Sequence, residues 1–289
     1  MRRQSHGFSL IELILVIGIM MVLLSLALPA VQKARGVARR LSCANNLRQV
    51  AIAIELHKSA KRHMPSGTRA AGSRQPYSGL CLHITPYLEQ QAIYDRSVVE
   101  FDRITDPFEH SLLRQFIGVY LCPEDGRIQG EVMSIRHNRF VATTSYLGVN
   151  GVSSDKRDGV LYVDSKTRDA EISDGLSYTL LLGERPPSRY FDFGWWYAGV
   201  GADGSGTLDH TLGTSETRST PYNVCGEVDG FVPTFDDECS VRVFWSPHEG
   251  VTHFAMCDSS IQILTSSIDR RLLDRLATRA NGEIAFIEQ

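Results

Sequence analysis

An uncharged apolar run near the amino terminus is the strongest pattern along the chain. No charged side chain occurs between Leu13 and Leu28, and the 21 residues from 8 to 28 include one acid, Glu12. A helix needs roughly 20 residues to cross the hydrocarbon core of a bilayer. Because the run is apolar on all sides, it does not match the one-sided pattern of a helix in a soluble domain. The pattern predicts a transmembrane helix over residues 8–28.

Beyond Pro29 the pattern becomes one-sided. Apolar residues recur at every third or fourth position, at Val31, Ala34, Val37, Leu41, Ala44, Leu47, Ala51 and Ile54. This spacing is typical of an amphipathic helix, and no strong helix breaker occurs before Pro65. We therefore expect one helix from residue 8 to about residue 61, roughly 80 Å long at 1.5 Å per residue. Residues 29–61 should pack their apolar stripe against the rest of the chain.

Residues 62–289 have a third pattern, in which Gly, Pro, Ser and Asp separate short β-rich runs. Short helices are expected over residues 80–88 and 112–121. Strands are expected over residues 141–149, 159–163, 179–183, 193–200, 241–245, 252–256 and 261–264. A tight turn at residues 258–260 would join the last two strands into a hairpin. The predicted fold class is α+β: a long hydrophobic helix followed by a mainly antiparallel, β-rich globular domain.

Charge is divided unevenly between the stem and the body. Residues 1–60 carry eight Lys and Arg against two acids, and the remaining residues carry 22 against 31. An acidic body argues against a nucleic-acid partner, and no helix-turn-helix spacing, basic stripe or RNA-binding aromatic box contradicts this. With 289 residues and 43% apolar composition, the chain has room for a membrane segment plus one sizeable domain or two small ones.

The six cysteines are scattered, at positions 43, 81, 122, 225, 239 and 257. None forms a C-x-x-C pair, so a zinc knuckle or a thioredoxin-type redox site has little support. An even number fits one to three disulfides if the body lies outside the cytoplasm, and free buried thiols are the alternative. Cys225 and Cys239 would close a 15-residue loop, worth about 3 kcal/mol. Spacing alone does not settle the pairing.

Glu12 separates three interpretations of the amino terminus. A secretory signal cleaved near Ser25-Leu26-Ala27 and a plain single-pass anchor both leave this carboxylate unexplained. A charge at membrane depth costs at least ~2.5 kcal/mol, so it usually marks a function and needs a partner. The third interpretation, a processed assembly signal, gives Glu12 that partner.

The sequence GFSLIE at residues 7–12 resembles the processing site of type IV prepilins and type II secretion pseudopilins. The resemblance implies that residues 1–7 are a leader peptide, that cleavage falls between Gly7 and Phe8, and that Phe8 is then N-methylated. Glu12 becomes mature residue five, whose charge pairs with the amino terminus of a neighbouring subunit during assembly. Pro29 becomes mature residue 22, where many pilins carry a proline that kinks the helix.

The count of positive charges on either side of the apolar run favours a body on the cytoplasmic side of the membrane. Two arginines precede the apolar run, whereas four cations follow it, namely Lys33, Arg35, Arg39 and Arg40. By the positive-inside rule the body would stay in the cytoplasm. The processing motif and the cysteines favour the other side of the membrane, in which case these four cations would meet lipid headgroups.

The body resembles one large bacterial family of pseudopilin-like proteins of unknown function. Its members join the prepilin leader to a domain ending in a box written H-X9-DG. The similar segments are residues 38–49, 86–91, 121–125, 145–148, 172–177 and 276–283, so the resemblance covers almost the whole chain. In the box, nine residues separate His248 from Asp258, but Ser259 replaces the expected glycine. If that position needs a left-handed backbone, a serine there strains the turn or changes its type.

The histidines in and near the box raise the question of a metal site. The sequence HEGVTH at residues 248–253 differs from the zinc motif H-E-x-x-H, because its second histidine comes one residue late and its glycine disfavours a helix. We expect His248 and Asp258 to bond to the backbone around the hairpin. A metal site built from His248, His253 and Asp258 is the alternative.

Three other groups of residues have a structural and a functional interpretation. Some type II secretion pseudopilins bind calcium in a carboxyl-terminal loop, and the acids here are Asp229, Asp236, Asp237 and Glu238. Because calcium needs six or more oxygens, a solvated loop is the preferred interpretation. Asp174 should begin a turn into a strand, with a cation site as the alternative. Residues 195–197, two tryptophans and a tyrosine, should be core, with an exposed ligand platform as the alternative.

Two hypotheses about function follow. The first is a pseudopilin-like subunit that assembles into, or associates with, a type II secretion or type IV pilus-like machine. The second is a binding module that the leader delivers to the membrane and whose body recognises an extracytoplasmic ligand. No Ser-His-Asp order, phosphate loop or plausible metal triad supports catalysis, so no enzymatic activity and no cofactor are expected.

The resemblance also implies partners and a location. The expected partners are a prepilin peptidase/methyltransferase, other pilin-like subunits and membrane lipid. The expected location is the bacterial inner membrane, crossed once, with residues 62–289 forming a periplasmic or extracellular domain.

Overall fold

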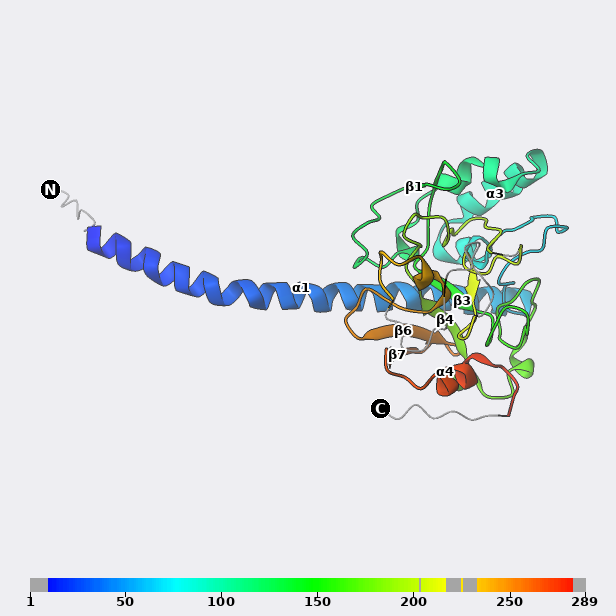
Figure 1. Ribbon diagram of the computed structural model, residues 1–289. Helices are drawn as coiled ribbons and strands as arrows, with labels where there is room; N and C mark the ends of the chain where they lie inside the picture. Colours follow the sequence, from blue (N-terminus) through cyan, green and yellow to red (C-terminus); the bar gives the residue numbers. More distant parts are fainter. Residues whose placement is uncertain (1–9, 203, 217–224, 226–232, 283–289) are drawn as a thin grey trace, which may run out of the picture.

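The amino-terminal spine of the molecule is one continuous helix. The structure is a computed structural model and describes residues 10–202, 204–216, 225 and 233–282. Helix α1 spans Leu10–Lys61, and its 52 residues correspond to roughly 78 Å at 1.5 Å per residue. Its first half projects from the body, and its second half runs through the body (Figure 1). The expected single helix, with its carboxyl end near residue 61, is confirmed over the described residues.

Burial changes abruptly along α1. Every residue from Leu10 to Arg35 is exposed, and the first buried side chain is Cys43. The buried residues then follow a helical spacing: Cys43, Leu47, Val50, Ala51, Ala53, Ile54 and His57. An apolar stripe on one side of a helix is what allows it to join a core on that side only. The second half of α1 is therefore part of the core of the body.

A five-stranded sheet is the centre of the body. Its strands lie in the order β5-β3-β4-β6-β7, and only the β3–β5 pair is parallel. Their bounds are β3 Tyr146–Val149, β4 Leu180–Glu184, β5 Thr211–Leu212, β6 Val251–Met256 and β7 Ile261–Thr265. A separate antiparallel pair joins β1, Val132–Ser134, to β2, Arg139–Val141.

Short helices cover the rest of the body. The α-helices are α2 Leu80–Ile84, α3 Gln91–Arg103 and α4 Arg270–Ala277. The 3-10 helices are η1 Thr85–Leu88, η2 Pro107–Glu109, η3 Ser111–Arg114, η4 Gly118–Tyr120, η5 Asp169–Glu171, η6 Leu176–Tyr178 and η7 Glu238–Arg242.

The sheet lies between α1 and α4 (Figure 1). Successive residues of a strand point to opposite faces, and the end of β6 shows this directly. Ala255 and Cys257 belong to the main core, which includes the buried stripe of α1. Phe254 and Met256 instead pack with Leu276 of α4 in a second cluster. This layered arrangement buries both faces of the sheet and confirms the predicted α+β class.

Several local predictions are confirmed. The 80–88 helix is present as α2 followed by η1, and β4, β6 and β7 occupy the strands expected at residues 179–183, 252–256 and 261–264. The hairpin is also present, with Thr252 paired to Leu264 and Ala255 to Ile261.

Other local predictions are wrong. Residues 241–245 are not a strand, because Asp237 caps the 3-10 helix η7 by accepting the N–H of Cys239 at 2.7 Å. Residues 159–163 and 193–200 form isolated bridges instead of strands. The 141–149 strand is divided between β2 and β3, and the 112–121 helix between η3 and η4. These segments are held by side chains distant in sequence, such as Asp209, whose carboxylate accepts the N–H of Gly194 at 2.9 Å.

Candidate functional site

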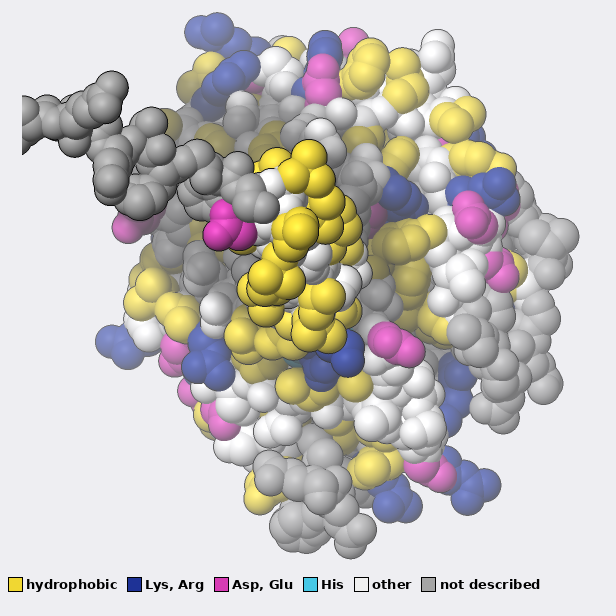
Figure 2. Space-filling model, turned by 90° about the vertical axis from the view of Figure 1, so that its left-hand side faces the viewer, with side chains coloured by type: hydrophobic (Ala, Val, Ile, Leu, Met, Phe, Trp, Pro, Cys, Tyr) yellow, Lys and Arg dark blue, Asp and Glu magenta, His cyan; other side chains and the backbone are white. Residues whose placement is uncertain are grey.

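The exposed half of α1 is the first candidate site. Its most apolar 18-residue window has a mean hydropathy of 2.8 and none of that window is buried, so α1 is long and apolar enough to cross a membrane once. Figure 2 looks along α1 from its amino-terminal side and shows hydrophobic side chains covering the projecting helix. Such a surface is costly in water, so it indicates contact with lipid or with other apolar helices.

Glu12 lies in the first turn of α1, on this exposed apolar half. It is the only acid among residues 8–54. The predicted cleavage site, between Gly7 and Phe8, lies outside the described residues. Pro29 lies inside α1, which remains helical on both sides of it and curves gently over its projecting half (Figure 1).

The cations that follow the apolar run differ in their surroundings. Arg39 pairs with Glu124 of the body through two contacts, the longer of which joins Nη2 to Oε1 at 3.2 Å. Arg39 therefore forms an ion pair between the stem and the body. Lys33 and Arg35 lie on the exposed part of α1.

A disulfide joins the stem to the body at the level of the first buried residue. Cys43 of α1 is bonded to Cys122, 79 residues later in the chain. Two hydrogen bonds flank this link: the Tyr146 hydroxyl donates to the carbonyl of Cys43 at 3.0 Å, and the Asn46 amide donates to the carbonyl of Leu121 at 2.9 Å. The orientation of α1 relative to the sheet is thus fixed covalently and by polar contacts.

The two cysteines of this disulfide belong to a group of four potential metal ligands. We call this group, Cys43, Cys122, Glu184 and His248, the buried centre. One ligand atom from each residue lies within 4.8 Å of the others, and all four residues are buried. The Nε2 atom of His248 is 3.5 Å from the Cys122 sulfur and 3.6 Å from Oε1 of Glu184. The four residues come from α1, the segment after η4, the end of β4 and the loop before β6.

Glu184 is the charged member of the buried centre and is 1% exposed. Its Oε2 atom accepts the backbone N–H of His253 at 2.9 Å and faces Nδ1 of the same residue at 2.8 Å. Burial raises the pKa of a carboxyl group, but the nearby His248 and His253 offset that effect and hold the pKa of Glu184 below its ordinary value. The carboxylate is therefore charged inside the protein. Its Oε1 atom has no hydrogen-bond partner.

The H-X9-DG-like box is divided between this centre and the hairpin. Asp258 bonds to the backbone as expected, since its Oδ1 accepts the N–H of Ser260 at 2.9 Å. His248 does not cap the hairpin backbone with its ring, because the ring faces Glu184 and Cys122. Ser259 has a φ of 66°, the left-handed region that favours glycine. The alternative considered from the sequence, a metal site of His248, His253 and Asp258, does not match the described group, in which His248 lies with Cys43, Cys122 and Glu184 while Asp258 lies in the β6–β7 turn.

The acidic residues 236–238 make local structural contacts. The structure joins Cys225 to Cys239, and Asp237 caps η7 beside this disulfide. Asp236 accepts from Arg189 through its backbone carbonyl at 2.9 Å, and Glu238 is the first residue of η7. Asp229 lies outside the described residues.

Asp174 and the aromatic run also have structural roles. The Asp174 carboxylate accepts the N–H groups of Asn281 and Gly282 at 2.9 and 2.8 Å, so it anchors the carboxyl-terminal segment. Trp195, Trp196 and Tyr197 are at most 3% exposed, so they are core and not an exposed platform.

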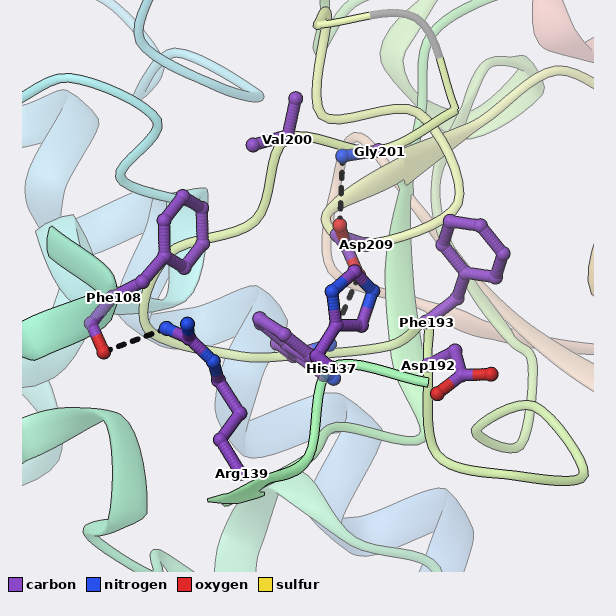
Figure 3. Close-up of a pocket in the computed structure, with 9 residues that line it drawn as sticks. Phe108, His137, Arg139, Asp192, Phe193, Val200, Gly201 and Asp209 are labelled. Carbon is purple, nitrogen blue, oxygen red and sulfur yellow. Dashed lines mark hydrogen bonds between the residues drawn. The ribbon is translucent and has the colours of Figure 1, made fainter. Parts of the chain in front are cut away.

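A small cavity of about 140 Å³ lies beside Trp195 (Figure 3). Its polar side chains mainly hold loops: Asp209 accepts from the backbone of Gly194 and Gly201, and Arg139 donates to the carbonyl of Phe108 at 2.9 Å. Burial raises the pKa of Asp209 to about 6. Because these groups are already engaged by the protein, the cavity offers few of the convergent, available polar groups of a ligand site.

The sequence did not reveal the buried centre as a unit. Cys43, Cys122 and His248 each lie in a segment that resembles the family, which was a signal that they matter. Nothing in the spacing of these residues showed that they meet, and Glu184 carried no signal in the sequence.

Comparison with known proteins gives two matches. Residues 32–271 match a family described as Protein of unknown function (DUF1559), and residues 2–28 match the Prokaryotic N-terminal methylation motif. No curated protein and no solved structure matches the chain. The first match covers most of the body, and the second covers the apolar run together with the expected cleavage site.

Proposed function

The chain belongs to the family of unknown function DUF1559 and carries a prepilin-type methylation motif, and from this premise we propose that it is a pseudopilin-like, membrane-anchored subunit. A prepilin peptidase/methyltransferase cuts it between Gly7 and Phe8 and methylates Phe8. The mature chain then assembles into, or associates with, a type II secretion or type IV pilus-like machine.

One observation carries this proposal: half of α1 projects from the body as an exposed apolar helix that contains a single acid, Glu12. A membrane anchor alone needs no carboxylate at that depth, where a charge is costly. In an assembly, the charge is offset by the ammonium group at the amino terminus of a neighbouring subunit. Attraction between these opposite charges also fixes the axial register of the two helices.

The same proposal includes an orientation. The body lies on the periplasmic or extracellular side of the bacterial inner membrane, which α1 crosses once. Support comes from the two disulfides of the body, Cys43–Cys122 and Cys225–Cys239, because such bonds persist in oxidising compartments.

Processing is tested by mass spectrometry of the amino terminus of the chain purified from its native membrane. The expected terminus is N-methylated Phe8. An intact Met1, or a terminus near Leu28, would show that the motif is not processed in this way.

Assembly is tested with Glu12→Ala, because removing the carboxylate removes the partner of the neighbouring amino terminus. We expect cleavage after Gly7 to continue, while cross-linking to other pilin-like subunits in the membrane falls at least tenfold. The matched control is Glu55→Ala on the part of the same helix that packs against the body, where its carboxylate pairs with Lys58 at 2.6 Å. Equal cross-linking of the Glu12→Ala variant and the wild type would favour a delivered binding module instead.

A further inference from the structure

The buried centre has the composition of a metal site. Two sulfurs, an imidazole nitrogen and a carboxylate oxygen form the kind of mixed donor set that binds Zn²⁺. These atoms lie within 4.8 Å of one another and belong to residues at most 8% exposed. Four ligands from four separate segments of the chain form a closed set, as in structural zinc sites.

Glu184 supplies the observation that points to a ligand. Its Oε1 atom is buried without a hydrogen-bond partner and faces His248 at 3.6 Å, longer than a hydrogen bond. A buried polar atom without a hydrogen bond costs free energy, so its presence needs an explanation. The other oxygen is held in place by the backbone and ring of His253. Orientation of a ligand by a second hydrogen bond is characteristic of metal centres.

The two sulfurs are bonded to each other in the structure, and a disulfide sulfur is a much poorer ligand than a thiolate. We propose that reduction of this disulfide turns the buried centre into a site for one Zn²⁺ ion. A dithiol reductant supplies two electrons and two protons, the S–S bond breaks into two thiols, and the reductant becomes a disulfide. Zn²⁺ then replaces the two thiol protons. Tetrahedral coordination requires the sulfurs to lie roughly 3.7 Å apart, from Zn–S bonds of about 2.3 Å.

The consequence is that the stem can be joined to the body in two alternative ways. The disulfide links α1 to the segment after η4. The ion would link the same two segments and add β4 and the loop before β6, through Glu184 and His248. The reduced chain therefore keeps a cross-link between stem and body, at the same place in the fold. This inference concerns the body alone and does not depend on the assembly role.

The test uses the full chain in detergent, reduced anaerobically with a phosphine that is then removed. Co²⁺ serves as a spectroscopic probe, and Zn²⁺ is measured by competition with a chromogenic chelator. We expect one equivalent of Co²⁺ with a thiolate charge-transfer band, its displacement by Zn²⁺, and no binding to the oxidised chain. Glu184→Gln and His248→Ala should weaken binding at least tenfold, whereas Cys81→Ser, which alters a buried unbridged thiol, should not.

A second measurement on the wild type keeps the test valid if a variant fails to fold. The reduced chain is alkylated with and without Zn²⁺, and each cysteine is mapped by mass spectrometry. Zinc should slow alkylation of Cys43 and Cys122 at least tenfold while Cys225 and Cys239 react as before. Alkylation of Cys43 and Cys122 that Zn²⁺ does not slow, or a Glu184→Gln variant that binds Co²⁺ as tightly as the wild type, would overturn the proposal.

Discussion

At the scale of single residues, a serine in the turn of the β6–β7 hairpin strains the backbone. Ser259 adopts a φ of 66°, which costs a non-glycine residue roughly 1–2 kcal/mol. We expect Ser259→Gly to raise the free energy of unfolding by up to ~1 kcal/mol, because glycine removes the strain but adds freedom to the unfolded chain. Urea denaturation of the body measures this. Ser260→Gly, next in the same turn, is the control and should be neutral or destabilising.

His210 is a second residue whose surroundings decide its behaviour. It is 1% exposed, and the chain passes so close at Gly79 that an added Cβ there would lie 2.2 Å from its Nδ1. Burial lowers the pKa of His210 to about 4. The unfolded chain takes up this proton near pH 6.5, so stability is lost as the pH falls from about 6.5 to about 4.

This pH dependence can be isolated by substitution. In wild type, His210 should account for a loss on the order of 2 kcal/mol between pH 7 and pH 5. His210→Gln removes the titrating group and retains a donor for the carbonyl of Tyr77, which His210 contacts at 3.1 Å. Urea denaturation at the two pH values should show a smaller loss in the variant. An unchanged loss would mean that other groups cause the pH dependence.

At the scale of elements, the two disulfides should differ in their effect on stability. Cys43–Cys122 spans 79 positions and Cys225–Cys239 spans 14. A longer loop loses more freedom in the unfolded chain when it is closed, which gives about 4.5 and about 3 kcal/mol respectively. Under oxidising conditions, replacing both cysteines of the first pair with alanine should therefore destabilise the body more. Guanidinium denaturation of the two double variants makes the comparison, and a larger loss from the second pair would contradict it.

The elements that could be predicted share one property: local pattern determines them. α1 has a continuous apolar run and then a regular stripe, and β6 and β7 are two short β-rich runs on either side of a tight turn. The Val241–Trp245 segment has the composition of a strand but follows Asp237, whose carboxylate caps a 3-10 helix. The capped helix takes up Val241 and Arg242, so the first two residues of the expected strand are helical despite their β propensity, which is a weak preference.

At the scale of the whole molecule, stem and body divide at the first buried residue of α1. Burial along α1 begins at Cys43, and residues 10–28 are all exposed. We expect a chain beginning at Pro29 to fold, to stay monomeric without detergent, and to melt within about 3 °C of the full chain. Calorimetry and size-exclusion chromatography check these points. Aggregation or a much lower melting temperature would show that the projecting half of α1 stabilises the body.

The sequence by itself determined the apolar run, the single helix to residue 61, the α+β class and the processing motif. Each of these depends on residues that are neighbours in the chain, where helical spacing, alternation and composition act directly. Only the tertiary structure decided that Cys43 pairs with Cys122, that Glu184 lies between His248 and His253, and that Arg39 binds the body. These contacts join residues up to 85 positions apart. No local periodicity encodes them, because they form only when α1 and the sheet pack around one core.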